Sequence, residues 1–340
     1  MCLYPKRMIN KKYTVTEKNQ GNVPKMADER CAYVEIPCGQ CIECREQKAR
    51  EWMVRLGEEL QNWEYKYFIT LTFAPKELEL ILKKTGLKEC NAAAEYAVRH
   101  MLERWRKRYK KSLKHWFITE LGHEGTERIH LHGIIFTNEK QEFELINKIG
   151  DKEYYKWQWW KYGIMNVGKY CNVRSTNYIV KYMTKIDTDH KGFIGQVLCS
   201  PGIGRSFLEK QGIEQYKYKP HESKDYYRLN NGKKIKLPKY YKNHLYNEEE
   251  RELIWRDFMD KEQTTIAGNT YYDKFTSNNI YGNIIGKARE KNKEFGYGDN
   301  SREWRKKEWN ITRRMLQQVE RKKRMDEMRK ALNMPLLGAI

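Results

Sequence analysis

The segment ERIHLHGIIF, residues 127–136, places two histidines one residue apart within a largely apolar run. Alternate side chains of a β-strand point to opposite faces, so a strand here would put His130 and His132 on one face and Leu131 on the other. Two imidazoles held side by side on a sheet can bind one divalent ion. Hydrogen bonding on a polar sheet face is the alternative explanation, and the motif alone does not decide between the two.

The neighbouring segments predict an α+β domain. Alternation and β-branched or aromatic residues predict strands, whereas apolar residues at helical spacing predict helices. The strands are expected at YFITLTF (67–73), KHWFITELG (114–122), the histidine segment and GIMNVGKYCNV (163–173). The helices are expected at 42–63, at 91–113 and at 175–186, the last beginning at Ser175 or Thr176. This order predicts a central antiparallel sheet flanked by helices.

The charge of the chain indicates a polyanionic partner. Its 340 residues hold 66 Lys and Arg against 45 Asp and Glu, a formal net charge of +21. Such an excess attracts nucleic acid through phosphate neutralisation and counterion release. No apolar run has the length of a membrane span, and the first residues lack the apolar core of a signal peptide. We therefore expect a soluble intracellular protein that makes no membrane contact.

Two tyrosines downstream of the histidines suggest chemistry on phosphorus. Tyr178 and Tyr182 are four residues apart in NYIVKYMTK (177–185), so a helix would place both phenols on one face. A tyrosine hydroxyl, with an ordinary pKa of about 10, can attack phosphorus when a metal polarises the phosphate and cations stabilise the developing charge. Packing explains such a pair when it stands alone. Its combination with the two histidines is the informative observation.

A third metal ligand is expected on a neighbouring strand. Glu120 lies in the predicted strand before the histidines, and a site of two histidines and one carboxylate leaves open positions for substrate oxygens. His123, Glu124 and Glu127 are alternative donors nearby.

The cysteines near the start of the chain form a second candidate metal site. Their spacing is CxxCxxC with a fourth thiol seven residues earlier, which would suit a tetrahedral structural Zn²⁺. Reduced structural cysteines are the alternative. The four candidates are Cys31, Cys38, Cys41 and Cys44.

Two further segments have two interpretations each. EYYKWQWWKY (153–162) holds six aromatic residues among lysines, a pattern that fits either base stacking or core packing. The basic segment 301–330 predicts a long charged helix that is either solvated or in contact with duplex phosphates.

These motifs together resemble a known family. HLH (130–132), the upstream strand YFITLTF and YIVKY (178–182) resemble the three motifs of HUH endonucleases. The resemblance is closer to the replication initiators of gokushoviruses, in the Microviridae, and covers about residues 30–210. It is carried by PCGQCIECREQKAREWMVRL (37–56), WKYGIMNVGKYCNVRSTNYIVKYMTK (160–185) and PGIGRSF (201–207).

The resemblance implies an HUH-type fold and a set of roles. The implied fold is a central antiparallel sheet flanked by helices, with an N-terminal segment at 1–65 that holds the cysteines and a helix, an endonuclease domain at 66–200, and a charged region at 201–340 with a basic helix. Mg²⁺ or Mn²⁺ would be bound by His130, His132 and Glu120. Tyr178 or Tyr182 would attack the DNA, and Lys181 would contact the scissile phosphate or the leaving oxygen.

The implied function is initiation of rolling-circle replication. Nicking would leave a 5′-phosphotyrosyl link and a free 3′-OH, followed by strand transfer and ligation. The expected partners are viral origin DNA, a host polymerase and a helicase, in the host bacterial cytoplasm. DNA contacts are expected from Lys185, Arg104, Arg106 and Arg108. A non-enzymatic single-strand binding module, an HUH transposase and a relaxase are the alternatives.

Overall fold

The computed structural model describes residues 1–299 except 18, 87–89, 123–127, 186–192, 230, 262, 267–268 and 273–277. Contacts divide the chain into two compact units. The first is Glu43–Ile284 with Met1, and the second is Cys2–Ile42 with the described residues from Ile285 onward. The basic helix expected at 301–330 lies outside the described residues, and the boundaries expected at 65 and 200 stay a prediction.

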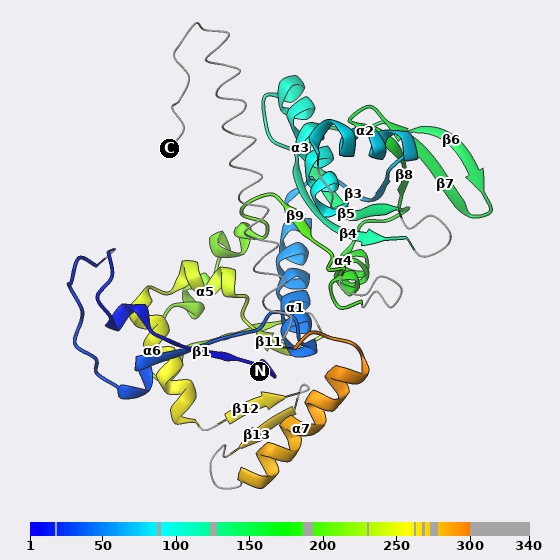
Figure 1. The fold of residues 1–340 in the computed structure, drawn as a ribbon. Helices are drawn as coiled ribbons and strands as arrows, with labels where there is room; N and C mark the ends of the chain where they lie inside the picture. Colours follow the sequence, from blue (N-terminus) through cyan, green and yellow to red (C-terminus); the bar gives the residue numbers. More distant parts are fainter. Residues whose placement is uncertain are drawn as a thin grey trace, which may run out of the picture. The chain divides into compact units, whose positions relative to one another are not determined.

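The first unit contains a seven-stranded sheet in which every paired neighbour is antiparallel (Figure 1). The strand order is β6-β7-β8-β3-β5-β4-β9, so the histidine strand lies between two central strands. The α+β fold with a central antiparallel sheet is therefore confirmed. The strands are β3 (Tyr65–Thr72), β4 (Lys114–Leu121), β5 (Ile129–Thr137), β6 (Glu144–Ile149), β7 (Lys152–Trp157), β8 (Trp160–Val167) and β9 (Val197–Cys199).

Alternation along the strands gives the sheet two distinct faces. On β5, Leu131 and Ile135 pack in one hydrophobic cluster with α2 (Pro75–Thr85) and α3 (Cys90–Tyr109). Ile134 and Phe136 pack in another cluster with α1 (Ile42–Glu59) and α4 (Val173–Val180). Figure 1 shows α2 and α3 on one side of the sheet and α4 on the other. The even-numbered positions of β5, His130 and His132 among them, therefore face the same side as α4.

Gly133 follows the second histidine because a neighbouring ring leaves no space for a side chain. A Cβ at this position would lie 2.1 Å from Cδ1 of Phe117, its cross-strand partner on β4. The glycine therefore allows a large aromatic ring to pack against the sheet directly beside the histidines.

Helix α1 packs on both of its sides. Its Leu56 contributes to the cluster on the α4 face of the sheet, while Val54 belongs to a third cluster with Phe207 and Tyr241. The helix predicted at 42–63 is thus confirmed to Glu59, after which η3 (Leu60–Asn62) follows. The third cluster draws on the other described elements of this part of the chain, which are η5 (Arg205–Glu209), η6 (Ile213–Tyr216), β10 (Tyr226–Arg228), β11 (Lys234–Lys236), α5 (Lys239–Leu245) and α6 (Glu248–Asp260).

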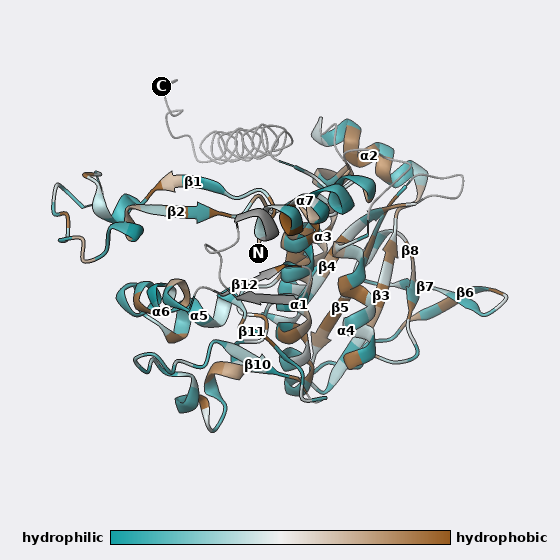
Figure 2. Ribbon diagram, turned by 90° about the horizontal axis from the view of Figure 1, so that it is seen from below, coloured by the Kyte–Doolittle hydropathy of each residue, from teal (hydrophilic) through white to brown (hydrophobic). Residues whose placement is uncertain are grey.

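The aromatic segment at 153–162 serves the core. Trp157, Trp159, Trp160 and Tyr162 are all buried in the cluster beneath α3, so core packing explains these four rings. Figure 2 shows apolar residues concentrated in β3, β5 and β8, whereas the β6–β7 hairpin is mostly hydrophilic.

The remaining elements are short or lie towards the ends of the chain. They are β1 (Lys6–Ile9), η1 (Lys11–Tyr13), η2 (Glu29–Ala32), β2 (Tyr33–Ile36), η4 (Lys181–Met183), β12 (Gln263–Ile266), β13 (Asn269–Tyr272) and α7 (Asn278–Glu294). Strands β1 and β2 pair with each other in an antiparallel ladder. Among the described residues, no helix combines the length and the apolar character needed to cross a membrane.

Candidate active site

Strand register brings three candidate residues of the sheet to one place. Glu120 on β4 lies directly opposite His130 on β5, and Thr70 on β3 lies opposite His132. These four side chains face α4, because the residues next to them along each strand pack in the cluster on the other face. Three adjacent strands thus build one polar patch on an otherwise apolar face.

His132 is held from both of its ring nitrogens. Nε2 lies 2.9 Å from Oε2 of Glu120, and Nδ1 lies 3.1 Å from the hydroxyl of Thr70. Such an outer hydrogen bond fixes the orientation of an imidazole, as it does for metal-bound histidines.

Lys185 supplies the positive charge next to this patch. Its ammonium hydrogen-bonds and ion-pairs with Oε1 of Glu120, so each carboxylate oxygen has its own partner. Burial acts to raise the pKa of Glu120, but the hydrogen bonds from His132 and Lys185 outweigh burial and leave that pKa below its ordinary value. The carboxylate is therefore ionised at neutral pH.

The two tyrosines come from a short helix and the turn that continues it. Helix α4 carries Tyr178 and ends at Val180, and Tyr182 lies in η4. The helix begins at Asn172, whose side chain accepts hydrogen bonds from the backbone of Arg174 and Ser175 in a capping box. The expectation that Ser175 or Thr176 is the N-cap is therefore wrong, because Ser175 is the third helical residue and its hydroxyl accepts a hydrogen bond from the Asn172 amide.

The phenols meet each other above the histidine. The two hydroxyl oxygens are 2.9 Å apart, and the Tyr182 ring stacks on His132 with centroids 4.2 Å apart and planes 8° apart. Tyr178 packs edge-on against Phe68 and is 51% exposed. Burial, followed by the hydrogen bond from Tyr178, raises the pKa of Tyr182 well above its ordinary value. The structure thus brings together the tyrosines and the polar patch from separate parts of the sequence.

Lys181 lies between the tyrosines along the chain and is exposed. It forms the C-cap of α4, and its ammonium makes no hydrogen bond or ion pair with the described residues. The structure therefore leaves this charge available to an added ligand.

The residue types of the patch fit a divalent cation, with one qualification in geometry. The 2.9 Å between His132 Nε2 and Glu120 Oε2 matches the separation of neighbouring donors around an octahedral ion, about 3 Å for bonds of about 2.1 Å. Burial, and then the charge of His132, lowers the pKa of His130, which favours the neutral imidazole that a metal needs. Within the described residues, however, these three do not form a group whose donor atoms all lie within 4.8 Å of one another. In this conformation the Lys185 ammonium supplies the cation of Glu120.

The alternative donors that the sequence offers near Glu120 cannot be compared with it. They are His123, Glu124 and Glu127, and all three lie outside the described residues.

The residues expected to contact DNA are divided between two places. Lys185 belongs to the tyrosine site through Glu120. Arg104 and Arg108 line a pocket beside Trp159, which packs in the cluster on the opposite face of the sheet. Arg106 is exposed on the same helix but does not line that pocket.

A four-cysteine group at the beginning of the chain can bind zinc, but its membership differs from the expected one. The donor sulfurs of Cys2, Cys38, Cys41 and Cys44 all lie within 4.8 Å of one another. Cys31 is not in the group; it is buried in η2 and its carbonyl accepts a hydrogen bond from Asn10. The CxxCxxC spacing identified three members, whereas the fourth depends on how the chain folds back on itself.

Two contributors to the site were missed by the sequence analysis. Thr70 fixes the His132 ring, and Phe68 supports Tyr178. Both lie on β3 at positions of the same parity, so the alternation of YFITLTF placed them on one face. Which face, and opposite which residues, depends on strand register.

Comparison with known proteins places this arrangement in a family. Residues 66–187, which include every residue of the polar patch and both tyrosines, match the model of the replication-associated protein ORF2 family. This part of the chain belongs to that family. The family resemblance inferred from the sequence motifs is thereby confirmed.

Two curated relatives carry names that agree with the match. The replication-associated protein VP4 of Bdellovibrio phage phiMH2K is 25% identical over 238 residues, covering 64% of this chain and 69% of the relative. The replication-associated protein ORF2 of Spiroplasma virus 4 is 24% identical over 275 residues, covering 75% of this chain and 82% of the relative. No solved structure matches the chain.

Proposed function

We propose that this replication-associated protein initiates rolling-circle replication by nicking one strand of viral origin DNA with a tyrosine. The observation that carries the proposal is the stacking of Tyr182 on His132, with the Tyr178 hydroxyl hydrogen-bonded to that of Tyr182. The names of the two phage relatives, both replication-associated, support the same process.

The proposed reaction is a transesterification at phosphorus. A tyrosine oxygen forms a bond to the phosphorus and the bond from phosphorus to the 3′ oxygen breaks. The tyrosine hydroxyl loses its proton, and the departing 3′ oxygen gains one, so the products are a 5′-phosphotyrosyl link and a free 3′-OH. No water is consumed, and the reverse reaction can rejoin ends without ATP. The 3′-OH is a primer for a host polymerase, which would act with a host helicase.

Each polar residue of the site has a proposed part in this reaction. Mg²⁺ or Mn²⁺, when held by Glu120, His130 and His132, would withdraw charge from the phosphate oxygens. Thr70 holds the His132 ring in place through Nδ1. Lys181, exposed and unpaired with any described residue, would contact the phosphate or the leaving oxygen.

Two adjacent hydroxyls suit replication better than a single cut. One tyrosine can stay linked to the 5′ end while the second attacks the junction completed after one round. Their oxygens, 2.9 Å apart, are close enough for either to reach the same phosphate. This favours a replication initiator over a transposase or a relaxase that uses one tyrosine.

The proposal is tested by looking for the covalent product. The full chain is incubated with a circular plasmid carrying the viral origin, with and without Mg²⁺ or Mn²⁺, and the DNA-linked protein is resolved on denaturing gels. We expect a site-specific nick and a protein–DNA adduct that disappears when both Tyr178→Phe and Tyr182→Phe are introduced, since the rings stay but both nucleophilic oxygens are gone.

A matched control is Tyr170→Phe, which removes an exposed hydroxyl outside the site. It should leave the adduct unchanged. Origin binding without any nick would select the non-enzymatic binding module, and an adduct that persists in the double Phe protein would refute the roles of both tyrosines.

We also propose that Cys2, Cys38, Cys41 and Cys44 bind one structural Zn²⁺. Four thiolates around zinc, with bonds of about 2.3 Å, lie about 3.8 Å apart, and the sulfurs of Cys2 and Cys41 are separated by 4.0 Å. The backbone amide of Cys38 donates to the Cys2 sulfur, and that of Cys41 donates to the Cys38 sulfur. Such bonds favour the thiolate that zinc requires.

Metal analysis of protein purified without added zinc tests this site. We expect about one zinc per chain in the natural protein and in Cys31→Ser, and a loss of zinc in Cys2→Ser, because only Cys2 is in the group. The opposite result, retention in Cys2→Ser and loss in Cys31→Ser, would restore the assignment expected from spacing. A natural protein without stoichiometric zinc would exclude the site.

A further inference from the structure

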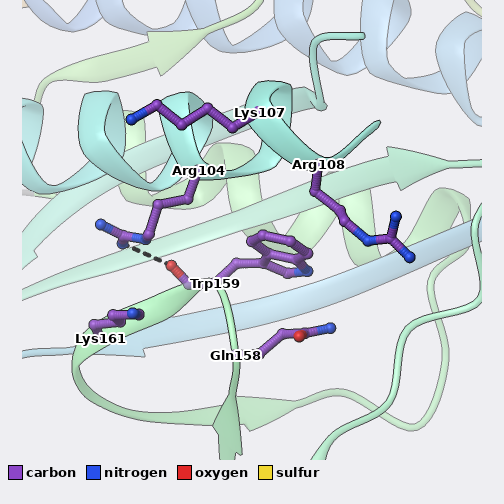
Figure 3. Close-up of a pocket in the computed structure, with 6 residues that line it drawn as sticks. All are labelled: Arg104, Lys107, Arg108, Gln158, Trp159 and Lys161. Carbon is purple, nitrogen blue, oxygen red and sulfur yellow. Dashed lines mark hydrogen bonds between the residues drawn. The ribbon is translucent and has the colours of Figure 1, made fainter. Parts of the chain in front are cut away.

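A basic pocket lies away from the tyrosines, beside the turn between β7 and β8 (Figure 3). Its volume is about 750 Å³. Four of its six lining residues are cationic and none is acidic. The lining residues are Arg104, Lys107 and Arg108 from α3, Gln158 and Trp159 from the turn, and Lys161 from β8.

The cations of this pocket are not neutralised by the protein. In the part of the chain that the structure describes, none of the four forms an ion pair with a carboxylate. Lys107, Arg108 and Lys161 are exposed. In Figure 3, Arg104 and Lys161 lie on one side of the Trp159 ring and Arg108 on the other, so the charges surround the pocket rather than meeting at one point.

The floor of the pocket is rigid and contains unpaired donors. Trp159 is only 9% exposed and packs against Trp105 and Tyr109, with ring centroids 5.5 and 5.7 Å apart. The Arg104 guanidinium donates to the carbonyl of Trp159 at 2.8 Å, which fixes α3 to the turn. The indole Nε1 of Trp159 and the Nε of Arg104 have no hydrogen-bond partner among the described residues. Buried donors of this kind are usually satisfied by water or a ligand.

The chemistry of the pocket selects a polyanion backbone rather than bases. A base stacks on an exposed ring face, whereas the Trp159 ring is covered by its neighbours. Unpaired arginine and lysine side chains are the groups that contact phosphodiesters without reading sequence. The pocket therefore fits a chain of phosphates.

The pocket and the tyrosines are on opposite faces of the sheet. Trp159 packs in the cluster under α3, and Tyr182 packs against the cluster that includes α4. DNA that occupies the pocket is thus separated from the reacting phosphate by the thickness of the sheet.

We propose that this pocket is a second DNA-binding site, which holds the phosphodiester backbone of origin DNA at a distance from the nick. The inference rests on the proposed function only in taking DNA as the partner. The pocket would anchor the protein on the origin and add affinity, while the tyrosine site alone would contact the scissile phosphate.

Binding measurements with matched charge variants test this proposal. The test variant combines Lys107→Ala, Arg108→Ala and Lys161→Ala and leaves Arg104, which has a structural contact, in place. The control combines Lys219→Ala, Lys233→Ala and Lys239→Ala, three exposed lysines of the same unit. Both are made in full-length protein that also carries Tyr178→Phe and Tyr182→Phe, so no covalent attachment contributes.

Fluorescence anisotropy is recorded with a single strand of about 30 bases and a duplex of about 30 base pairs over a range of NaCl concentrations. We expect the test variant to lose at least about 10-fold in affinity at ~100 mM salt on one or both probes, and the slope of log K against log salt to fall by about 2 to 3. The probe with the greater loss identifies the form of DNA that the pocket holds.

A second variant separates charge from shape. The combination of Lys107→Arg, Arg108→Lys and Lys161→Arg keeps all three charges and should keep the natural salt slope. Equal losses in the test and control variants on both probes would overturn the proposal, as would an unchanged slope in the test variant. Because the readout is binding without either hydroxyl, its outcome is independent of whether the protein nicks DNA.

Discussion

Lys185 occupies a position of particular consequence at the scale of single residues. Its ammonium pairs with the Glu120 carboxylate, the same group that we assign to the divalent ion. A metal bound there and the ammonium would compete for one carboxylate and would also repel each other. The cation of lysine therefore stabilises the site without metal and opposes the loaded site.

Lys185→Ala should consequently tighten Mn²⁺ binding. Because the lysine side chain is half exposed, the expected gain is modest, about 2- to 5-fold, in line with the roughly 0.2–1 kcal/mol of exposed ion pairs. Titration of Mn²⁺ followed by electron paramagnetic resonance measures it. Lys181→Ala removes the same charge from a side chain that pairs with no described residue, and should change the affinity less. Weaker Mn²⁺ binding in Lys185→Ala would contradict this account.

At the scale of the element, α4 is a short helix that depends on its cap. Eight residues are too few for a helix to be stable by itself, so its position comes from packing of Ile179 and Val180 and from the capping box at Asn172. The cap satisfies backbone amides that the first turn leaves without partners. Tyr178 depends on this element for its place beside Phe68.

Removing the cap should loosen α4 locally. Asn172→Ala is expected to cost about 1 kcal/mol, which corresponds to about a fivefold faster hydrogen exchange of the amides in Val173–Val180. Mass spectrometry of exchange after pepsin digestion measures this. Ser175→Ala is the matched variant and should have a smaller effect, since it removes only the hydrogen bond to the Asn172 amide. Unchanged exchange in Asn172→Ala would show that packing alone holds the helix.

At the scale of the whole molecule, a buried histidine links the start of β4 to the end of β9. His115 is 6% exposed, and its Nδ1 lies within hydrogen-bond distance of the carbonyl of Leu113 and the hydroxyl of Ser200. Burial lowers the pKa of His115 to about 4, from an ordinary value near 6.5. The unfolded chain therefore binds this proton at a higher pH than the folded protein.

Acidification should destabilise the protein through this residue. The stabilisation from the neutral ring is present above pH 6.5 and is lost as the pH falls towards 4, with a difference of about 2 kcal/mol between pH 7 and pH 5. Urea unfolding at both pH values measures it. His115→Gln should reduce the pH dependence, and the exposed His244→Gln should not. Parallel pH profiles for the natural protein and His115→Gln would refute the effect.

The local patterns of the sequence determined the elements and the face of each residue. Alternation in IHLHG set both histidines on one side of β5, and the four-residue spacing set Tyr178 and Tyr182 on one side of a helical segment. Both follow from the geometry of the backbone over a few residues, which needs no knowledge of distant contacts. The resemblance to replication initiators was also accessible at this level, because its motifs are short and continuous.

Strand register, chain reversal and helix docking were decided only by the tertiary structure. The pairing of His132 with Thr70 across 62 residues, the choice of Cys2 over Cys31, and the placement of Arg104 on the face opposite the tyrosines all join distant positions. Such contacts form when separate elements bury their apolar faces together, and local spacing has no information on which faces will meet. The sequence by itself therefore determined which side chains share a face, and the packing of α3 and α4 on opposite sides of one sheet decided which of them share a site.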